Sequence, residues 1–239
     1  MSERRARTAL PGAVGLLLFA AVAAAGAGLR AAGPREGGPA AWTPAEAERF
    51  LLEASVVSVE KDAQPGRTLP WMVTLEKAGV RARAVFKYVH RPRPHPLAHS
   101  YRYELAAYEL SKLLEIEIVP PTVERTIQGV PGALQLYIDG CVSERDFARA
   151  GAQPSNPQAL RNSLATVRLF EGLTGDSCGD KDDTLIHPDT WKACRVDLAE
   201  AFPTEPVLSE DCLIERCPRS LRGHLSFFLQ PSLRDSKER

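Results

Sequence analysis

The spacing of apolar residues changes along the chain from a period of two to a period near 3.6, which predicts where strands give way to helices. Before residue 90, three stretches have the pattern of strands, at 55–59, 71–76 and 80–89, and in the last of them apolar and polar residues alternate. A Lys-Ala-Gly turn signal at 77–79 separates the last two. We therefore expect three strands in an antiparallel meander.

Four segments have the spacing of amphipathic helices: Trp42–Leu52, Tyr101–Leu114, Asn156–Leu173 and 211–229, the last interrupted by a proline. The first opens with Thr-Pro, the pattern of an N-cap followed by proline at the first helical position. The second and third carry leucines at helical intervals on one face. These helices would cover the predicted sheet and build most of the second half of the chain.

Shorter strands are predicted between these helices. They are expected at Ile116–Val119, Thr122–Ile127, Gly132–Ile138, near Leu185 and at Ala193–Asp197. His90–Ser100 contains three prolines and three histidines and should be a loop. No carboxylate is interleaved with the histidines, so a metal site is not expected there. A meander with a helix, followed by a mostly helical half, predicts an α+β fold.

The first 44 residues differ from the rest. Three arginines precede an uncharged run, Ala9–Leu29, rich in Ala, Leu, Val and Gly. Residues 1–30 are therefore interpreted as a signal peptide or a single membrane anchor, and both alternatives place the rest of the chain outside the cytoplasm, in an exported, periplasmic or secretory compartment. Residues 31–44, rich in Gly, Pro and Ala, are expected to be a flexible linker.

Composition and charge narrow the range of possible partners. The chain is 44% hydrophobic, and its 30 basic and 30 acidic residues cancel, which disfavours nucleic acid as a partner. Its five cysteines leave at least one unpaired. Cys178 with Cys194 and Cys212 with Cys217 are plausible bridges outside the cytoplasm, and buried free thiols are the alternative.

Two charged residues stand where phosphate-binding chemistry would need them. Lys87 ends an apolar strand, and Glu104 lies in the first turn of the following helix. A lysine on a strand paired with a glutamate on the next helix can fix nucleotide phosphates. We predict that the two side chains lie within ion-pair distance and face one cleft.

Several segments in order resemble one family. They are 73–75, 84–87, 103–110, 119–123 and 132–137, with a Phe-Lys strand end, a Glu-bearing helix and a Val-Pro-Pro strand among them. Over residues 50–202 the chain resembles the bacterial proteins related to phosphatidylinositol 3- and 4-kinases, to actin-fragmin kinase and to Four-jointed-type secretory kinases.

That resemblance implies a two-lobed, protein-kinase-like fold. Residues 45–140 would be the N-lobe, an antiparallel sheet with a helix, and 141–239 a reduced, mostly helical C-lobe. Lys87 and Glu104 would clamp the phosphates of ATP. Gln135, Leu136 and Tyr137 would form the hinge whose backbone meets the adenine.

The catalytic loop departs from the family pattern. By the resemblance, Cys178 occupies the position of the catalytic Asp, while Asp183 and Asp197 would be the ligands of Mg²⁺ or Mn²⁺. A thiol cannot replace a carboxylate as a proton acceptor, so Asp176 or Asp180 would have to substitute for it. The C-terminal segment is also shorter than the family implies.

We therefore expect a nucleotide- and metal-binding, pseudokinase-like protein outside the cytoplasm, with little or no phosphotransferase activity. One alternative is an active secretory or cell-envelope kinase whose substrate is a protein or glycan hydroxyl. The other is a non-catalytic envelope scaffold or interaction protein. In each case contact with a membrane would come only through the N-terminal segment.

Overall fold

The computed structural model describes residues 39–61, 68–94, 98–176 and 180–203, all within the unit Glu36–Arg239. The expected signal or anchor, Cys178 and the helix expected at 211–229 lie outside these residues. Among the helices that are described, none is both long and apolar enough to cross a bilayer.

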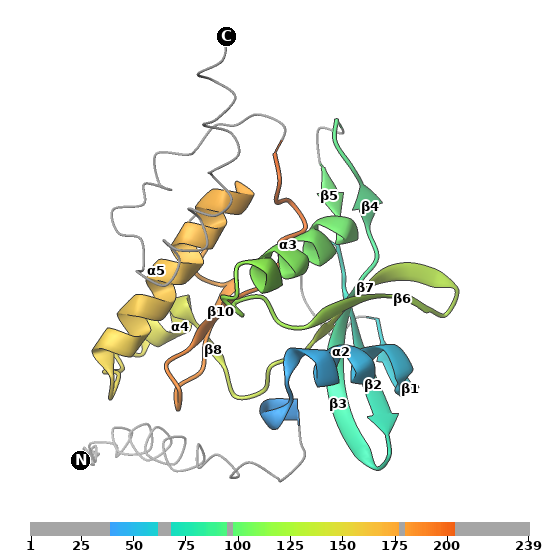
Figure 1. The fold of residues 1–239 in the computed structure, drawn as a ribbon, viewed down its shortest axis with the longest axis horizontal. Helices are drawn as coiled ribbons and strands as arrows, with labels where there is room; N and C mark the ends of the chain where they lie inside the picture. Colours follow the sequence, from blue (N-terminus) through green and yellow to red (C-terminus); the bar gives the residue numbers. More distant parts are fainter. Residues whose placement is uncertain (1–38, 62–67, 95–97, 177–179, 204–239) are drawn as a thin grey trace, which may run out of the picture. The chain divides into compact units, whose positions relative to one another are not determined.

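A five-stranded antiparallel sheet dominates the first half of the chain (Figure 1). Its strands are β1 (Ser55–Glu60), β2 (Trp71–Lys77), β3 (Val80–Lys87), β6 (Thr122–Ile127) and β7 (Val130–Leu136). Their order is β1-β2-β3-β7-β6, so the expected meander is confirmed and a second hairpin joins its β3 edge.

Both long hairpins close through two-residue turns. Ala78 and Gly79 connect β2 to β3, and Gln128 and Gly129 connect β6 to β7, with φ angles of 52°, 77°, 51° and 80°. Positive φ at both turn positions matches the right-handed twist of the flanking strands, which is why a glycine stands second in each.

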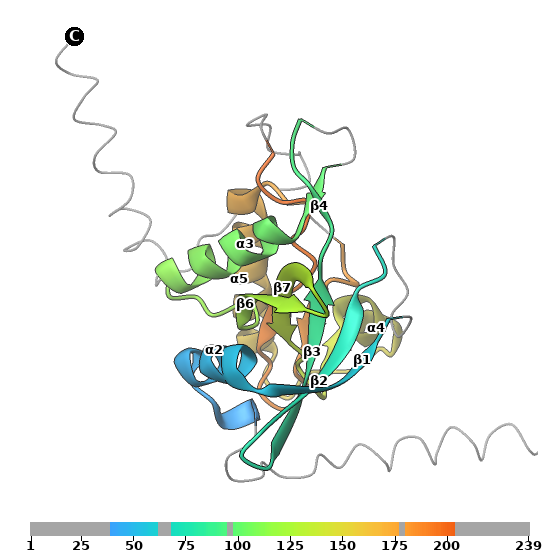
Figure 2. The ribbon, with the colours of Figure 1, turned by 90° about the vertical axis from the view of Figure 1, so that its right-hand side faces the viewer.

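Helices lie beside this sheet and beyond it. They are η1 (Pro39–Ala41), α2 (Pro44–Glu53), α3 (Tyr101–Leu113), α4 (Glu144–Arg149) and α5 (Pro157–Thr174). Figure 2 shows α2 and α3 on one side of the sheet. The three long helices expected within the described residues are thus confirmed, and α4 was not expected.

Two hairpin-like elements complete the fold. β4 (His90–Arg91) pairs with β5 (His99–Ser100), so the segment expected to be only a loop contains a small hairpin. A three-stranded sheet of order β10-β9-β8 joins β8 (Val142–Ser143), β9 (Thr184–Ile186) and β10 (Ala193–Arg195). These short strands carry much of the polar chemistry described below.

The strand expected at Ile116–Val119 is wrong. The backbone N–H groups of Ile118 and Val119 both donate to Ser111 Oγ at 3.1 and 3.4 Å, while the Ile118 carbonyl accepts from Arg195 N at 2.8 Å. Both apolar side chains are buried. These backbone groups are thus satisfied by the Ser111 side chain and by a single bond from β10, rather than by a ladder of hydrogen bonds to a neighbouring strand.

The buried apolar residues form two clusters. The first joins α2 to the sheet and includes Leu51, Phe86 and Leu134. The second joins α3, α5 and the small sheet and includes Phe170 and Ile186. The described structure is therefore α+β, as expected, with an antiparallel sheet and a few helices.

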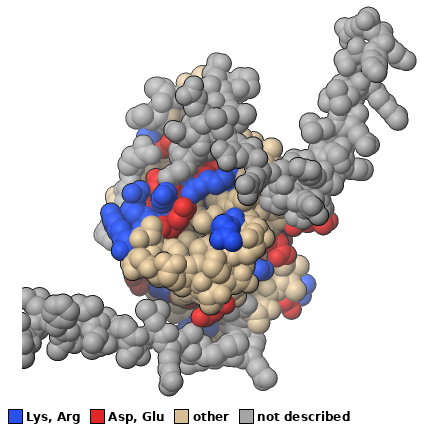
Figure 3. Space-filling view, turned by 90° about the vertical axis from the view of Figure 1, so that its left-hand side faces the viewer, with Lys and Arg blue, Asp and Glu red and all other residues tan. Residues whose placement is uncertain are grey.

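Charged side chains of both signs lie together on the surface. On the face drawn in Figure 3, basic and acidic residues adjoin each other at the edge of a broad uncharged area. Ion pairs made by arginines of α4 and α5 include Arg145 with Asp182 at 2.6 Å, and Arg168 with Glu144. This mixture accords with the zero net charge of the chain.

Candidate functional site

A cleft of about 340 Å³ opens between the end of the large sheet and the small sheet. Its walls include the apolar side chains of Val85, Pro120, Leu185 and Val196. This volume lies at the lower end of the range for small-molecule sites. The cleft therefore offers an apolar slot of the size that one ring system can fill.

Lys87 stands at the polar end of this cleft because it is the last residue of β3. Its Nζ lies 2.5 Å from Glu104 Oε1 and 3.1 Å from Asp197 Oδ1, and its side chain is 12% exposed. The expected ion pair with Glu104 is confirmed. Burial alone would lower the pKa of Lys87, but the two carboxylates raise it above its ordinary value.

The Glu104 side chain is buried, so its position is fixed by the surrounding residues. It lies in the first turn of α3, where an acidic residue is favoured, and its side chain is 1% exposed. Burial raises its pKa, while the charge of Lys87 opposes that shift. Lys87 is thus fixed from behind by a buried carboxylate and remains a cation facing the cleft.

Asp197 follows β10 and faces the same end of the cleft. Its backbone has φ of 58°, in the left-handed region that is uncommon for non-glycine residues but that Asp adopts more readily than most. The charge of Lys87 lowers the pKa of Asp197, so this half-exposed side chain is an anion near neutral pH.

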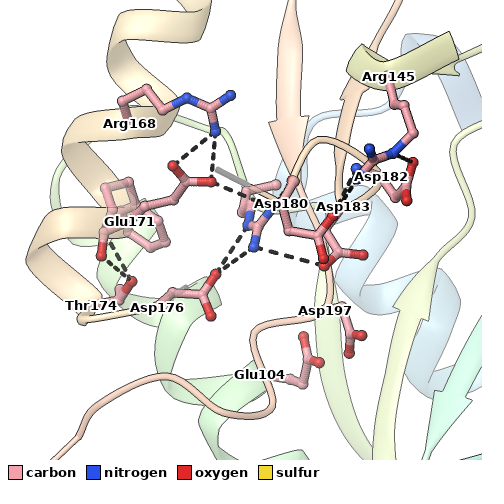
Figure 4. A network of polar contacts seen from close by, with 12 residues as sticks. Glu104, Arg145, Arg168, Glu171, Thr174, Asp176, Asp180, Asp182, Asp183 and Asp197 are labelled. Atoms are coloured by element: carbon pink, nitrogen blue, oxygen red, sulfur yellow. Dashed lines mark hydrogen bonds and ion pairs between the residues drawn. The ribbon is translucent and has the colours of Figure 1, made fainter. Parts of the chain in front are cut away.

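Asp183 lies across from Asp197 and also lines the cleft (Figure 4). Burial raises its pKa to about 7, and the nearby charge of Asp197 adds to the shift. Its Oδ2 lies 3.8 Å from Arg195. Two carboxylates that repel each other are a suitable place for a divalent cation, which would bind both.

A metal here would need further oxygen ligands. Within the described residues no group of three or more His, Cys, Asp or Glu side chains is arranged to hold a metal ion. Mg²⁺ usually binds proteins through one or two carboxylates and completes its shell with water and phosphate oxygens. Asp183 and Asp197 fit that mode of binding, which requires the phosphates of a ligand.

The expected hinge residues line the cleft, but most of their polar groups are already occupied. The amides of Leu136 and Tyr137 donate to Pro121 O at 2.8 Å and Arg83 O at 3.0 Å. The Gln135 side chain donates to Thr122 Oγ1 at 3.0 Å. These groups hold the segment in place and leave less of it for a ligand than expected.

The next residue, Ile138, has a backbone amide that is not already occupied within the described residues. Ile138 lines the cleft beyond the end of β7, and no internal hydrogen bond of its amide is seen among the described residues. The amide of Ile138 is therefore available to a ligand in the cleft, and the sequence analysis did not single out this residue.

Asp176 is bound by a buried arginine. Arg195, on β10 and 0% exposed, donates from Nε at 3.1 Å and from one terminal nitrogen at 2.7 Å to Asp176 Oδ2. Arg195 also lies 3.4 Å from buried Glu171, which Arg168 contacts at 2.9 Å. A carboxylate held in such a network stabilises the fold and is poorly placed to act as a general base.

Asp180 is the more accessible of the two expected substitutes. Its Oδ1 accepts from Asp182 N at 3.0 Å and lies 3.7 Å from Arg145, and its side chain is 46% exposed. The part of the cleft defined by described residues does not include it. The structure thus brings Lys87 and Asp197 together and leaves Asp180 outside their immediate group.

Three residues of this region were not expected to matter. Arg195 contacts Asp176, the backbone carbonyl of Asp180 and Asp183. His99 and Cys141 line the cleft. Burial lowers the pKa of His99, whose Nδ1 lies 3.6 Å from Glu200. For Arg195 the available signal was a single charge within a short apolar strand.

Comparisons with known proteins add little to this geometry. No protein-family model matches the sequence, and no curated protein is significantly similar to it. The open conformation of CtTel1 matches 62% of this chain with a TM-score of 0.35 and 10% identity, and the complete CtTel1 dimer with C2 symmetry does so with a TM-score of 0.35 and 12% identity. The match spans only 8% of each CtTel1 chain, and similarity this low indicates neither a family nor a function.

Proposed function

We propose that the cleft binds ATP with Mg²⁺ or Mn²⁺, in a two-lobed, kinase-like protein with little or no phosphotransferase activity. One observation carries this proposal: Lys87 is fixed between Glu104 and Asp197 at the polar end of an apolar slot. The chemistry of that end suits phosphates, and the chemistry of the slot suits a base.

The phosphates would interact with Lys87, and the cation would be held by Asp183 and Asp197. When bound, a divalent cation neutralises phosphate charge and would relieve the repulsion between the two carboxylates. Glu104 keeps Lys87 in place, because it is buried and cannot follow the ligand. Burial of both members of this pair favours a fixed geometry over a flexible surface contact.

The surroundings of the cleft support the two-lobed interpretation. The first apolar cluster lies within 47–136, and the second draws on residues between 107 and 201. The cleft is lined from both sides, by Val85 and Leu136 on one and by Leu185 and Val196 on the other. That arrangement suits an N-lobe of 45–140 and a reduced C-lobe of 141–239.

The proposed weakness of phosphate transfer follows from the residues at positions 176, 178 and 180. Asp176 is occupied by Arg195, Asp180 is turned towards Arg145, and position 178 is a cysteine. A positioned base typically contributes about 10²–10⁴-fold to the rate, so its loss would leave binding intact and transfer slow. An N-terminal signal or anchor would place this protein outside the cytoplasm, where a protein or glycan is the proposed partner.

A thermal-shift titration of the full chain with ATP and Mg²⁺ tests binding. At a nucleotide concentration 100-fold above Kd, stabilisation should be about 2.7 kcal/mol. The Asp197→Ala variant should lose the metal-dependent part of this shift, and Asp189→Ala, at an exposed site outside the cleft, should keep it. Absence of any shift in the unaltered protein would leave the scaffold interpretation.

Turnover measurements separate a weak enzyme from an active one. Cys178→Asp should raise transfer or nucleotide hydrolysis with little change in Kd, because the new carboxylate acts in the transition state. Turnover of the unaltered protein at roughly 1–100 s⁻¹ would contradict the proposal. Loss of such turnover in Asp180→Asn would then identify Asp180 as the base.

A further inference from the structure

The β4–β5 hairpin contacts the segment that follows Asp197 in the chain. Residues 199–202 present four consecutive backbone carbonyl groups to this hairpin, and each carbonyl accepts a hydrogen bond from it. The first bond comes from the backbone, since Ser100 N donates to Ala199 O at 2.8 Å. The other three come from the side chain of Arg93, which lies between β4 and β5. They measure 2.7 Å to Glu200 O and 2.9 Å to each of Ala201 O and Phe202 O.

An arginine side chain suits this arrangement better than a lysine would. The guanidinium group is planar, its five N–H donors have fixed directions, and it stays protonated in proteins. Both terminal nitrogens of Arg93 donate, Nη2 to Glu200 and Nη1 to the two residues after it. Tyr103 of α3 supports the group, because its ring centroid lies 5.3 Å from the guanidinium carbon and its hydroxyl accepts from Arg93 N at 3.2 Å.

Asp197 lies between two stretches of backbone that are held in place. Before it, Val196 N donates to the carbonyl of Asp183, just ahead of β9, at 2.9 Å. After it, Leu198 and Ala199 are buried, and the bonds to the hairpin begin at Ala199. The carboxylate of Asp197 therefore reaches the cleft from a backbone that is fixed on both sides.

We propose that Arg93 is a positioning residue for the metal site: it holds residues 199–202 and thereby keeps the Asp197 carboxylate at the polar end of the cleft. This inference rests on the proposed function, in which Asp197 is a ligand of Mg²⁺ or Mn²⁺. Arg93 is not among the described residues that line the cleft, so it acts through the backbone and not on the ligand. Groups that orient a metal ligand contribute to metal affinity although they do not touch the metal.

The same hairpin also reaches the cleft itself. His99 of β5 lines the cleft, and its Nδ1 lies 3.6 Å from Glu200 Oε1, within the segment that Arg93 holds. The proline- and histidine-rich stretch that was expected to be only a loop therefore connects one wall of the cleft to the backbone that follows Asp197.

Hydrogen exchange of the full chain without ligand tests the contact. Arg93→Ala removes three bonds to carbonyls, so the amides of 198–202 should exchange about tenfold faster or more. The segment should loosen without unfolding the protein, since Phe202 N also donates to Thr174 O of α5 at 2.6 Å. Arg91→Ala, at an exposed position of the same hairpin, is the matched control and should leave these amides unchanged.

Calorimetric titration with ATP, in the presence and absence of Mn²⁺ and well below the Tm of each variant, tests the positioning role. In Arg93→Ala the Kd of Mn²⁺-dependent binding should rise about 10–100-fold, while binding of ATP without metal, through Lys87, should be unchanged. A role in stability alone would lower Tm without this split. Arg93→Lys keeps the charge beside Tyr103 but has one donating nitrogen in place of two, so its changes should be smaller and of the same sign.

Unchanged exchange at 198–202 in Arg93→Ala would overturn the proposal, and so would faster exchange with unchanged Mn²⁺-dependent binding. If Arg93→Ala fails to fold, the same two comparisons are made with Arg93→Lys. Failure of the unaltered protein to bind ATP with or without Mn²⁺ would instead reject the proposed function, and the exchange rates would still decide whether Arg93 holds the segment.

Discussion

The pKa of Asp183 is unusually high for a carboxylate that is proposed to bind a metal ion near neutral pH. Burial and the charge of Asp197 raise its pKa to about 7. Its protonated form therefore predominates in mildly acidic solution, where an ordinary Asp is ionised. A divalent cation must displace that proton to bind, since only the carboxylate is a good ligand.

We predict that metal-dependent nucleotide binding weakens about tenfold for each pH unit below 7, because each unit lowers the ionised fraction of Asp183 tenfold. Calorimetric titration with Mn²⁺ and nucleotide between pH 5.5 and 8 measures this dependence. Asp183→Asn should bind metal weakly, with a flatter pH profile. A flat profile in the unaltered protein would contradict a role for Asp183 as a ligand.

Asp176 and Asp180 should differ in what their loss costs. Asp176→Ala removes a buried partner of fully buried Arg195 and should destabilise the protein by about 3–5 kcal/mol. Asp180→Ala removes an exposed carboxylate and should cost less than about 1 kcal/mol. Urea unfolding of both variants measures the difference, and equal costs would argue against the structural role of Asp176.

The sequence predicted paired residues better than buried networks. Lys87 and Glu104 could be matched because each stands at a boundary that the sequence predicts, the end of one strand and the first turn of the next helix. Arg195 could not, since its partners Glu171 and Asp176 come from another element, and a lone arginine in a strand usually indicates an exposed side. Burial of that charge is decided by tertiary contacts.

Among the elements, α2 is the one whose start is most strongly encoded. Thr43 Oγ1 accepts from Glu46 N at 3.3 Å, and Glu46 Oε2 accepts from Thr43 N at 2.8 Å. Proline follows at the first helical position. This capping box satisfies donors that the helix itself leaves open, and α2 then buries Phe50 and Leu51 against the sheet.

We predict that Thr43→Ala lowers the free energy of unfolding by about 1 kcal/mol, since α2 is part of the first core. Ser143→Ala, which removes the matching cap of α4, should cost less than half of that. The reason is that α4 buries none of its side chains and can fray locally. Urea unfolding distinguishes them, and a larger loss for Ser143→Ala would contradict this account.

Local signals decide which elements were predictable. The strands of the two long hairpins carry alternating residues and glycine turns, and α2, α3 and α5 carry caps and helical spacing. The strands expected near Leu185 and at Ala193–Asp197 are present as β9 and β10, whereas the sequence did not predict β8, which is two residues long and pairs with β9, far along the chain. The short apolar run at 116–119 looks like a strand, and only its buried position beside Ser111 decides otherwise.

On the scale of the whole described unit, helix α3 belongs to the second apolar cluster and contacts α2, which belongs to the first, through polar side chains. Its residues Ala107 and Tyr108 belong to the second cluster, while the Tyr108 hydroxyl donates to Glu48 of α2 at 2.7 Å. Lys112 binds the same Glu48 at 3.0 Å. Helix α3 thus connects the sheet and its helix to the second half, and the cleft lies where both halves meet.

A ligand in that cleft should therefore stabilise both halves together. We predict that ATP with Mg²⁺ slows hydrogen exchange in β3 and in β9 by the same factor, about 100-fold at a ligand concentration of 100 Kd, for amides that exchange only through unfolding. Amides that exchange by local fraying, as in the first turn of α4, should not change. Hydrogen-exchange mass spectrometry of the full chain resolves these segments.

Asp197→Ala provides the control for this coupling, because it removes a proposed metal ligand that belongs to neither apolar cluster. In that variant, nucleotide should give little protection from hydrogen exchange, and the protection should be equal in β3 and β9. Protection confined to β9 and β10 would mean that the halves open independently and that the cleft does not join them. Equal protection of β3 and β9, lost together in the variant, is the result that a ligand bound between the two halves requires.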